Sequence, residues 1–290
     1  MTVPPPVRVR VHVGGIVQGV GFRPFVHGLA GELGLAGTVG NDATGVVVEV
    51  EGGAAAVDEF VSALRERPPA LAVVESVCAE PIPATGAHGL VITASTATGA
   101  RAALVSADTA TCDACLAELR DPTDRRYRFP FVNCTHCGPR LTIVRDVPYD
   151  RATTTMAAFP MCAPCAAEYH DPADRRFHAQ PTCCPDCGPT LSLHPHGPGD
   201  PVRDAAARLR EGAVLAVKGL GGYHLAVRAD DAVAVARLRA AKHREDKPFA
   251  VMAPSLDAAR ALVDLQEGAV EVLTSRRAPI VLLPRRRGAA

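Results

Sequence analysis

The feature that most constrains the fold of this chain is a duplicated pattern of paired cysteines in its middle third. Two residues separate the cysteines of each pair, and eighteen residues separate the two pairs of each repeat. The repeats, residues 112–141 and 162–191, are offset by 50 positions and share Asp-Pro, Asp-Arg-Arg and Gly-Pro runs. The eight cysteines are Cys112, Cys115, Cys134, Cys137, Cys162, Cys165, Cys184 and Cys187.

This spacing is typical of structural zinc sites. A tight turn over two residues directs both sulfurs at one ion, and two such turns complete a tetrahedron with Zn–S bonds of about 2.3 Å. Four thiolates leave no position for water, so we predict two structural zinc ions. The pairs can close a site within each repeat or across the repeats. We expect the repeated arginine pairs and Arg140 to offset the negative charge of the thiolates.

Metal binding also explains how the segment folds, because residues 111–193 are poor in periodic apolar residues. We interpret His136, His178, Cys183 and Cys78 as bystanders, although Cys183 can replace Cys184 in a distorted site. Ten cysteines in one chain argue for metal binding when no secretory signal precedes them. The start lacks such a signal, and no apolar run is long enough to span a membrane. We therefore expect a cytoplasmic protein.

The first 95 residues alternate strand and helix patterns. Residues 7–13 alternate apolar and charged residues as a half-buried strand does. The expected strands are residues 7–13, 38–41, 46–51, 75–80 and 90–93, and the expected helices are residues 22–33 and 54–65. The order βαββαβ predicts an α+β, ferredoxin-like domain. The small residues 94–103 predict a linker after it.

The segment Gly14–Arg23 (GGIVQGVGFR) lies between the first strand and the first helix. Glycines here leave backbone N–H groups free to hold an anion at the helix N-terminus, and Arg23 adds a fork-shaped cation. Glycines in such a loop are, by themselves, more often only a turn. This string, the following Pro-Phe-Val, and Asn41 with Gly45 resemble the acylphosphatase signature. The resemblance implies that Arg23 and the N–H groups of Gln18, Gly19, Val20, Gly21 and Phe22 bind a phosphoryl group, and that Asn41 positions a water.

After a second expected linker, residues 194–201, the last ninety residues show an α/β pattern. Helices are expected at residues 204–211 and 231–242, and strands at 214–218, 249–253 and 280–283. The whole chain contains only three lysines beside 28 arginines, and all three lysines lie in this region. The segment resembles the beginning of a YrdC-like domain. That resemblance implies ATP binding, with Lys218, Lys242, Arg244 and Lys247 contacting the nucleotide.

These three segments occur in the order that characterises HypF-type carbamoyltransferases, and the chain resembles the N-terminal part of that family. We therefore expect an acylphosphatase-like domain (residues 1–97), a duplicated zinc module (105–195) and a partial α/β YrdC-like domain (200–290). The resemblance implies hydrolysis of carbamoyl phosphate, formation of a carbamoyl-adenylate, and transfer to the acceptor cysteine of a hydrogenase maturation protein. No transferase domain precedes Ala290. We expect a truncated gene or fragment, or a partner that supplies the rest, with the hydrolytic step retained.

Two other interpretations compete with this one. A zinc-dependent interaction module, resembling that of DnaJ-type chaperones, explains the cysteines but not the first hundred residues. An RNA-linked binder is suggested by YrdC-like domains of tRNA modification. A net charge of zero and the lack of interleaved aromatic residues count against it, so we expect no nucleic-acid partner.

Overall fold

The computed structural model describes residues 5–96, 101–195 and 199–288. The chain forms two compact units, Met1–Pro189 and Thr190–Ala290. Parts of both expected linkers lie outside the described residues, namely residues 97–100 and 196–198, as do residues 289–290 of the tail. The first unit contains a sheet with two helices, followed by residues 105–189, which we call the cysteine-rich module.

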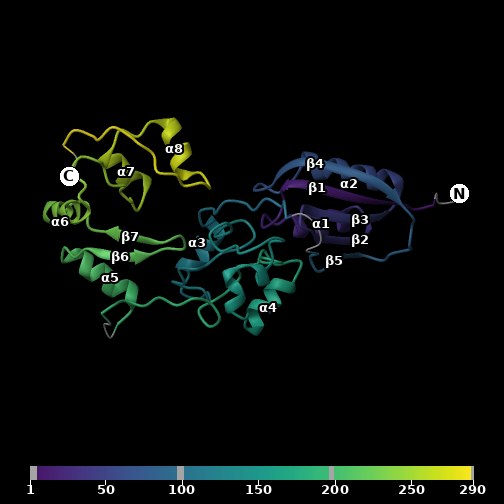
Figure 1. Cartoon of the computed structure of the whole chain (residues 1–290), viewed down its shortest axis with the longest axis horizontal. Coiled ribbons are helices and arrows are strands. Elements are labelled where there is room, and N and C mark those ends of the chain that lie inside the picture. The colour runs from purple at the N-terminus through teal and green to yellow at the C-terminus, as the bar shows by residue number, and fades with distance from the viewer. Residues whose placement is uncertain (1–4, 97–100, 196–198, 289–290) are drawn as a thin grey trace. The chain divides into compact units, whose positions relative to one another are not determined.

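The sheet has five strands in the order β4-β1-β3-β2-β5 (Figure 1). The bounds are β1 (Val7–Ile16), β2 (Ala36–Asn41), β3 (Gly45–Gly52), β4 (Val73–Ile82) and β5 (Leu90–Ile92), with α1 (Phe22–Glu32) and α2 (Ala54–Glu66) between them. β1 pairs antiparallel with β3 and β4, β2 pairs antiparallel with β3, and β5 lies parallel to β2. The predicted ferredoxin-like βαββαβ arrangement is therefore confirmed.

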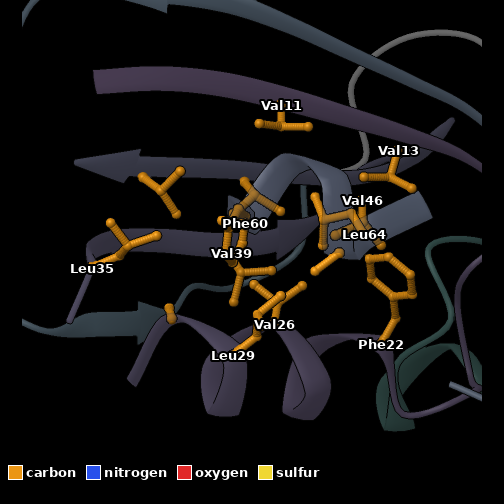
Figure 2. Packing of buried hydrophobic residues seen from close by; sticks show 14 of the residues in the cluster. Val11, Val13, Phe22, Val26, Leu29, Leu35, Val39, Val46, Phe60 and Leu64 are labelled. Carbon is orange, nitrogen blue, oxygen red and sulfur yellow. The ribbon is translucent and has the colours of Figure 1, made fainter. Parts of the chain in front are cut away.

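The core of this domain lies between the sheet and the two helices. Alternate valines of β1, such as Val11 and Val13, point toward helix residues such as Val26 and Phe60 (Figure 2). The intervening residues of β1 face the other side, where Arg8 and Arg10 form ion pairs with Glu49. Strand alternation thus produces one apolar face and one charged face. The loop before α1 stands at the end of this core, where Phe22 anchors it.

The cysteine-rich module contains short helices: α3 (Asp113–Arg120), η1 (Arg151–Thr153), η2 (Thr155–Ala158) and α4 (Ala163–His170). Cys112 and Cys162 are the residues that precede α3 and α4, so each helix starts within the first cysteine pair of its repeat. The sequence predicted an irregular segment, and these two helices were missed. They are only eight residues long, too short for a helical period to stand out.

The second unit contains α5 (Pro201–Arg210), β6 (Leu215–Lys218), β7 (Tyr223–Ala226), α6 (Ala232–Lys242), α7 (Leu256–Leu262) and α8 (Glu267–Thr274). The strands β6 and β7 pair antiparallel. The predicted strands at residues 249–253 and 280–283 are wrong, because neither segment pairs with β6 or β7. Apolar residues alone do not make a strand; a hydrogen-bonded neighbour is required. Among the described residues, no helix is both long enough and apolar enough to cross a bilayer.

Candidate functional site

The eight paired cysteines form two separate clusters, one in each repeat. Cys112, Cys115, Cys134 and Cys137 lie together, as do Cys162, Cys165, Cys184 and Cys187, with all sulfurs of a cluster within 4.8 Å of one another. Neighbouring Sγ atoms are 3.5–3.8 Å apart in the first cluster and 3.6–3.8 Å apart in the second. A tetrahedron with Zn–S bonds of 2.3 Å has S···S edges of about 3.8 Å. The clusters are therefore consistent with two zinc ions, each held within its own repeat.

The other candidate ligands lie outside these clusters. Cys183 is buried but belongs to neither cluster, so it does not replace Cys184. Cys78 is exposed on β4, and His136 is exposed within its cysteine turn. His178 is no metal ligand either, but it lies at a different site, described below. The expected bystanders thus stay outside the metal clusters.

The two repeats brace one another through their arginine pairs. Arg125 of the first repeat donates to Cys165 Sγ of the second at 3.3 Å, and Arg175 of the second donates to Cys115 Sγ of the first at 3.0 Å. Arg126 and Arg176 are buried and donate to Glu168 (3.0 Å) and Glu118 (3.1 Å) of the opposite repeat. The predicted placement of these arginines near the thiolates is correct. The hydrogen bonds cross between repeats, which the linear pattern did not reveal.

Arg140 has a different position from the one predicted. Its guanidinium donates to the backbone carbonyls of Cys134, Thr135 and Cys137 at 3.0 Å each. Its Nε donates to the carbonyl of Gly19 in the Gly-rich loop. Arg140 is 1% exposed. It therefore joins a cysteine turn to the loop before α1, instead of facing the sulfurs.

The Gly-rich loop is positioned by its own backbone and by one buried glutamine. Gly19 and Gly21 adopt positive φ angles of 72° and 77°, a conformation that glycine adopts without strain. Gln18 donates through Nε2 to the carbonyls of Asp42 and Gly45, at 2.8 and 2.7 Å. The loop ends at the first turn of α1, where helix N–H groups are unpaired and Pro24 has none to lose. This geometry suits an anion.

Two predicted site residues, Arg23 and Asn41, line one pocket beside this loop. Asn41 ends β2 and is 3% exposed, yet neither its Nδ2 nor its Oδ1 has a hydrogen-bond partner. Buried amides are nearly always paired, so this orphaned pair of atoms indicates a place for a water or ligand. Arg23 is also buried and donates from Nη2 to Asp150 Oδ1 at 2.9 Å. The same wall of the pocket is completed by four residues of the loop and the start of α1, namely Val17, Gly19, Gly21 and Phe22.

The opposite wall of the pocket comes from the cysteine-rich module. The sequence did not predict that this module lies against the Gly-rich loop. Its lining residues there are Thr135, Arg140, Tyr149, His178, Ala179, Gln180 and Pro181. The backbone N–H of Tyr149 donates to Gln18 Oε1 at 2.8 Å, and the Tyr149 ring lies against Gly19. The cavity between these walls is small, about 20 Å³, which is room for about one water molecule. The module thus closes the Gly-rich loop into a small pocket, which we call the chamber.

Electrostatics inside this chamber keep two ring side chains neutral. Burial lowers the pKa of His178 to about 4, and the positive charge of Arg23 acts in the same direction. Burial raises the pKa of Tyr149 to about 12. His178 Nδ1 and Tyr149 Oη are both buried without a hydrogen-bond partner. The chamber therefore contains two buried cations, Arg23 and Arg140, together with several neutral polar atoms.

The second unit has a larger pocket, of about 270 Å³. Its lining residues are Tyr223, His224, Leu225, Leu238, Lys242, Arg244, Pro248, Phe249 and Ala250. The structure thus brings Lys242 and Arg244 together. Lys218 lies on β6, with its Nζ 5.6 Å from the centre of the Tyr223 ring, and it does not line the pocket. Lys247 is exposed and also outside the lining, so only part of the predicted nucleotide set converges.

Comparison with known proteins agrees with this division of the chain. The Acylphosphatase family model matches residues 9–91, and the HypF finger model matches residues 111–144 and 161–194. The Sua5/YciO/YrdC model, described as telomere recombination, matches residues 207–289. Carbamoyltransferase HypF2 of Cupriavidus necator is 51% identical over 98% of this chain. This chain belongs to the HypF family.

The match covers one part of the HypF proteins. This chain spans 36% of the Cupriavidus necator HypF2 and corresponds to the N-terminal part of the family. A crystal structure of a full-length HypF, in a phosphate- and nucleotide-bound form, aligns with a TM-score of 0.95 and 44% identity. The alignment covers 100% of this chain and 39% of that one. The predicted family and α+β fold are thereby confirmed.

The first domain of this HypF-family chain is an acylphosphatase domain. The acylphosphatase of Caldivirga maquilingensis is 51% identical over 77 residues, which are 26% of this chain and 80% of that enzyme. The matched region contains the loop, Arg23 and Asn41 of the chamber. The DnaJ-type alternative left this region unexplained, and the family assignment now accounts for it.

Proposed function

We propose that this HypF-family chain hydrolyses carbamoyl phosphate in the chamber that contains Arg23 and Asn41. The observation that carries the proposal is the buried, unpaired amide of Asn41 facing a pocket that also holds a buried arginine and the Gly-rich loop. A phosphoryl group needs donors from several directions, and a water needs one oriented hydrogen-bonding group. The residues that line this pocket supply both, and the pocket would widen to admit a substrate, because its present space holds about one water molecule.

In the proposed mechanism, the phosphoryl oxygens lie against the loop and receive the guanidinium of Arg23. Arg23 then exchanges Asp150 for the phosphoryl group as its hydrogen-bond partner. Asn41 holds a water in line with the bond between phosphorus and the acyl oxygen. The water oxygen forms the new bond to phosphorus while that P–O bond breaks. Carbamate leaves with the bonding electron pair, and the proton of the water passes to the released phosphate.

The cysteine clusters take a structural part in this proposal. Each would hold one zinc ion with four sulfur ligands, which leaves no open coordination position for substrate. The metal would supply the folding energy that keeps Arg140, Tyr149 and His178 in place against the loop. No chemical step passes through the metal.

The later steps, activation of carbamate with ATP and transfer of the carbamoyl group, are proposed for a protein of the full HypF length. The pocket of the second unit, with Lys242 and Arg244, would bind the phosphates of ATP, as lysine and arginine commonly do. Carbamate would there become a carbamoyl-adenylate. The acceptor would be a cysteine of a hydrogenase maturation partner. The lysines Lys218 and Lys247 would join this site only after a rearrangement.

The experiment is the release of phosphate from carbamoyl phosphate by the wild-type chain, beside Arg23→Ala and Asn41→Ala. We expect both variants to lose activity by at least about 100-fold, because each removes a group that acts in the transition state. Arg67→Ala, at an exposed position at the end of α2, is the matched arginine control and should retain activity. A folded, metal-loaded wild type without activity would refute the proposal, as would an active Arg23→Ala variant.

A further inference from the structure

His178 lines the chamber but has no role in the proposed hydrolysis. It lines the pocket together with Arg23 and Asn41, although it lies in the second cysteine repeat. Its ring packs against Tyr169 and Phe177, with ring centres 4.9 and 4.6 Å away. These contacts hold the ring in one orientation. Its Nδ1 is buried and has no hydrogen-bond partner.

The backbone of His178 belongs to the repeat, but its side chain does not. His178 has a φ of 53°, and its counterpart Arg128, 50 residues earlier, has a φ of 58°. The N–H of each bonds to the helix of its own repeat, at Tyr169 and Leu119 respectively. The unusual backbone is therefore part of the repeated fold. Arg128 does not line the chamber, so the histidine side chain is specific to the copy that faces the Gly-rich loop.

Every residue that the repeats contribute to the pocket lining differs from its counterpart in the other repeat. Thr135, Arg140, His178, Ala179, Gln180 and Pro181 have the counterparts Pro185, Thr190, Arg128, Phe129, Pro130 and Phe131. Residues that the repeats need for metal binding and bracing are identical in both copies, namely the cysteines, the Asp-Arg-Arg run and Glu118 with Glu168. The two copies thus share their structural residues and differ where one of them lines the pocket.

The unpaired nitrogen also has a defined chemical character. A neutral imidazole carries one donor and one acceptor nitrogen. Nδ1 is the unpartnered nitrogen that is buried at the pocket. In the tautomer with the proton on Nε2, Nδ1 is an acceptor, and that is the tautomer on which the inference rests. An acyl phosphate with an amide N–H would satisfy it, whereas one with a methyl group would leave it unpaired.

We propose that His178 is a specificity residue of the acyl phosphate site, whose Nδ1 accepts a hydrogen bond from the amide group of carbamoyl phosphate. The inference rests on the proposed hydrolysis of acyl phosphates and names the group that recognises the acyl end. Carbamoyl and acetyl phosphate have nearly the same size, so a steric pocket does not distinguish them. A buried acceptor does, because it is left without a partner by the substrate that lacks the N–H.

The experiment compares kcat/KM for carbamoyl and acetyl phosphate in wild type, His178→Leu and His178→Asn. Asparagine tolerates a positive φ, and its Oδ1 restores an acceptor close to the position of Nδ1. We expect His178→Leu to lower the carbamoyl-to-acetyl ratio about tenfold, and His178→Asn to keep it within about twofold. Arg128→Leu places the same backbone strain in the other repeat and should leave the ratio unchanged.

The outcomes separate this inference from the proposed function. Equal losses on both substrates in both His178 variants would overturn the specificity role and leave acyl phosphate hydrolysis intact. No phosphate release from either substrate by the folded, metal-loaded wild type would overturn the proposed function and this inference with it. If His178→Leu loses its metal, His178→Gln, whose longer side chain moves the acceptor, replaces it. An unchanged ratio in that variant would also overturn the inference.

Discussion

Arg23, at the end of the Gly-rich loop, donates a hydrogen bond of 2.9 Å to Asp150, which lies 127 residues further along the chain in the cysteine-rich module. The side chain of Arg23 is 9% exposed and that of Asp150 is 27% exposed, so this ion pair is largely shielded from water. A carboxylate thus holds the cation that the phosphoryl group of the substrate would need. The module therefore acts on Arg23 and the chamber through charge as well as through shape.

Replacing Asp150 by asparagine should strengthen phosphate binding. The substitution keeps the size of the side chain and removes the negative charge that competes for Arg23. We expect inorganic phosphate to inhibit the variant at a concentration about three- to tenfold lower than for wild type, because one nearby like charge is gone. Inhibition constants measured side by side test this. Weaker inhibition by phosphate would mean that Asp150 orients Arg23 and does not compete for it.

Glycine-to-alanine changes should have opposite effects at Gly19 and Gly28. A Cβ on Gly19 would lie 3.1 Å from the Tyr149 ring at a φ of 72°, and we expect a loss of about 1–2 kcal/mol in stability together with reduced hydrolysis. Gly28, exposed in α1 with open space around it, should gain about 0.5–1 kcal/mol on conversion to alanine. Urea unfolding of both variants provides the measurement. A neutral Gly19→Ala variant would contradict the tight contact with the module.

Loss of one metal cluster should weaken the other. Cys165→Ser removes a ligand of the second cluster, and that cluster contacts Arg125 of the first repeat. Arg175 of the second repeat donates to Cys115 of the first cluster, and this hydrogen bond depends on the fold of the repeat that has lost its ligand. We therefore expect metal affinity at the first cluster to fall about 10- to 100-fold. Metal content and chelator competition measure this. Cys78→Ser, at an exposed site outside both clusters, is the control and should behave as wild type.

The two glutamates that pair with the buried arginines should contribute strongly to stability. Burial by itself would raise the pKa of Glu168, but the hydrogen bonds from Arg126 and Arg125 outweigh it and lower the pKa to about 2. Glu118→Gln and Glu168→Gln should each cost about 2 kcal/mol, below the value for a fully buried pair because these carboxylates remain partly exposed. Glu59→Gln, in an exposed pair with Arg67, should change stability by less than about 0.5 kcal/mol. Equal effects at all three sites would refute the bracing role.

The stability of the first unit should depend on pH through His178. The pKa of His178 in the folded chain is about 4, below the usual value of about 6.5. As the pH falls, the unfolded chain therefore takes up a proton on this histidine before the folded chain does. Stability should therefore fall as the pH drops from about 6.5 to 4, and His178→Asn should make that slope shallower. The groups that act on the ring are Arg23, His170, Asp150 and His27. Unfolding midpoints of both proteins across this range, compared pairwise, test the claim; parallel curves would contradict it.

Local patterns were sufficient to predict the first domain. The strands expected at residues 7–13, 38–41 and 46–51 recur in the structure as β1 and the β2–β3 hairpin, because each depends on neighbouring residues. The Gly-rich loop followed for the same reason: it needs positive φ angles where the glycines stand. The metal clusters were equally accessible, since two residues between cysteines place both sulfurs on one turn.

Long-range features were not accessible in this way. The strands predicted at residues 249–253 and 280–283 failed because strand pairing depends on distant partners. The sequence around His178 predicts no functional role for it, because nothing in its own neighbourhood distinguishes it. One signal was available: the repeats differ at residues 128 and 178 while they agree at the cysteines. This difference between the two copies indicates that the repeated fold does not require a histidine at position 178.

The sequence by itself therefore determined the ferredoxin-like domain and the eight cysteines of the two clusters, since periodicity, turn chemistry and short spacings are local, and its resemblance to the HypF family determined the family. Only the tertiary structure decided that each metal cluster closes within its own repeat and that the arginine arms cross between repeats. It also decided that the cysteine-rich module covers the Gly-rich loop, with Asp150 paired to Arg23 and His178 lining the chamber. These pairings depend on how compact segments pack, and packing selects partners by shape and charge, whatever their separation along the chain.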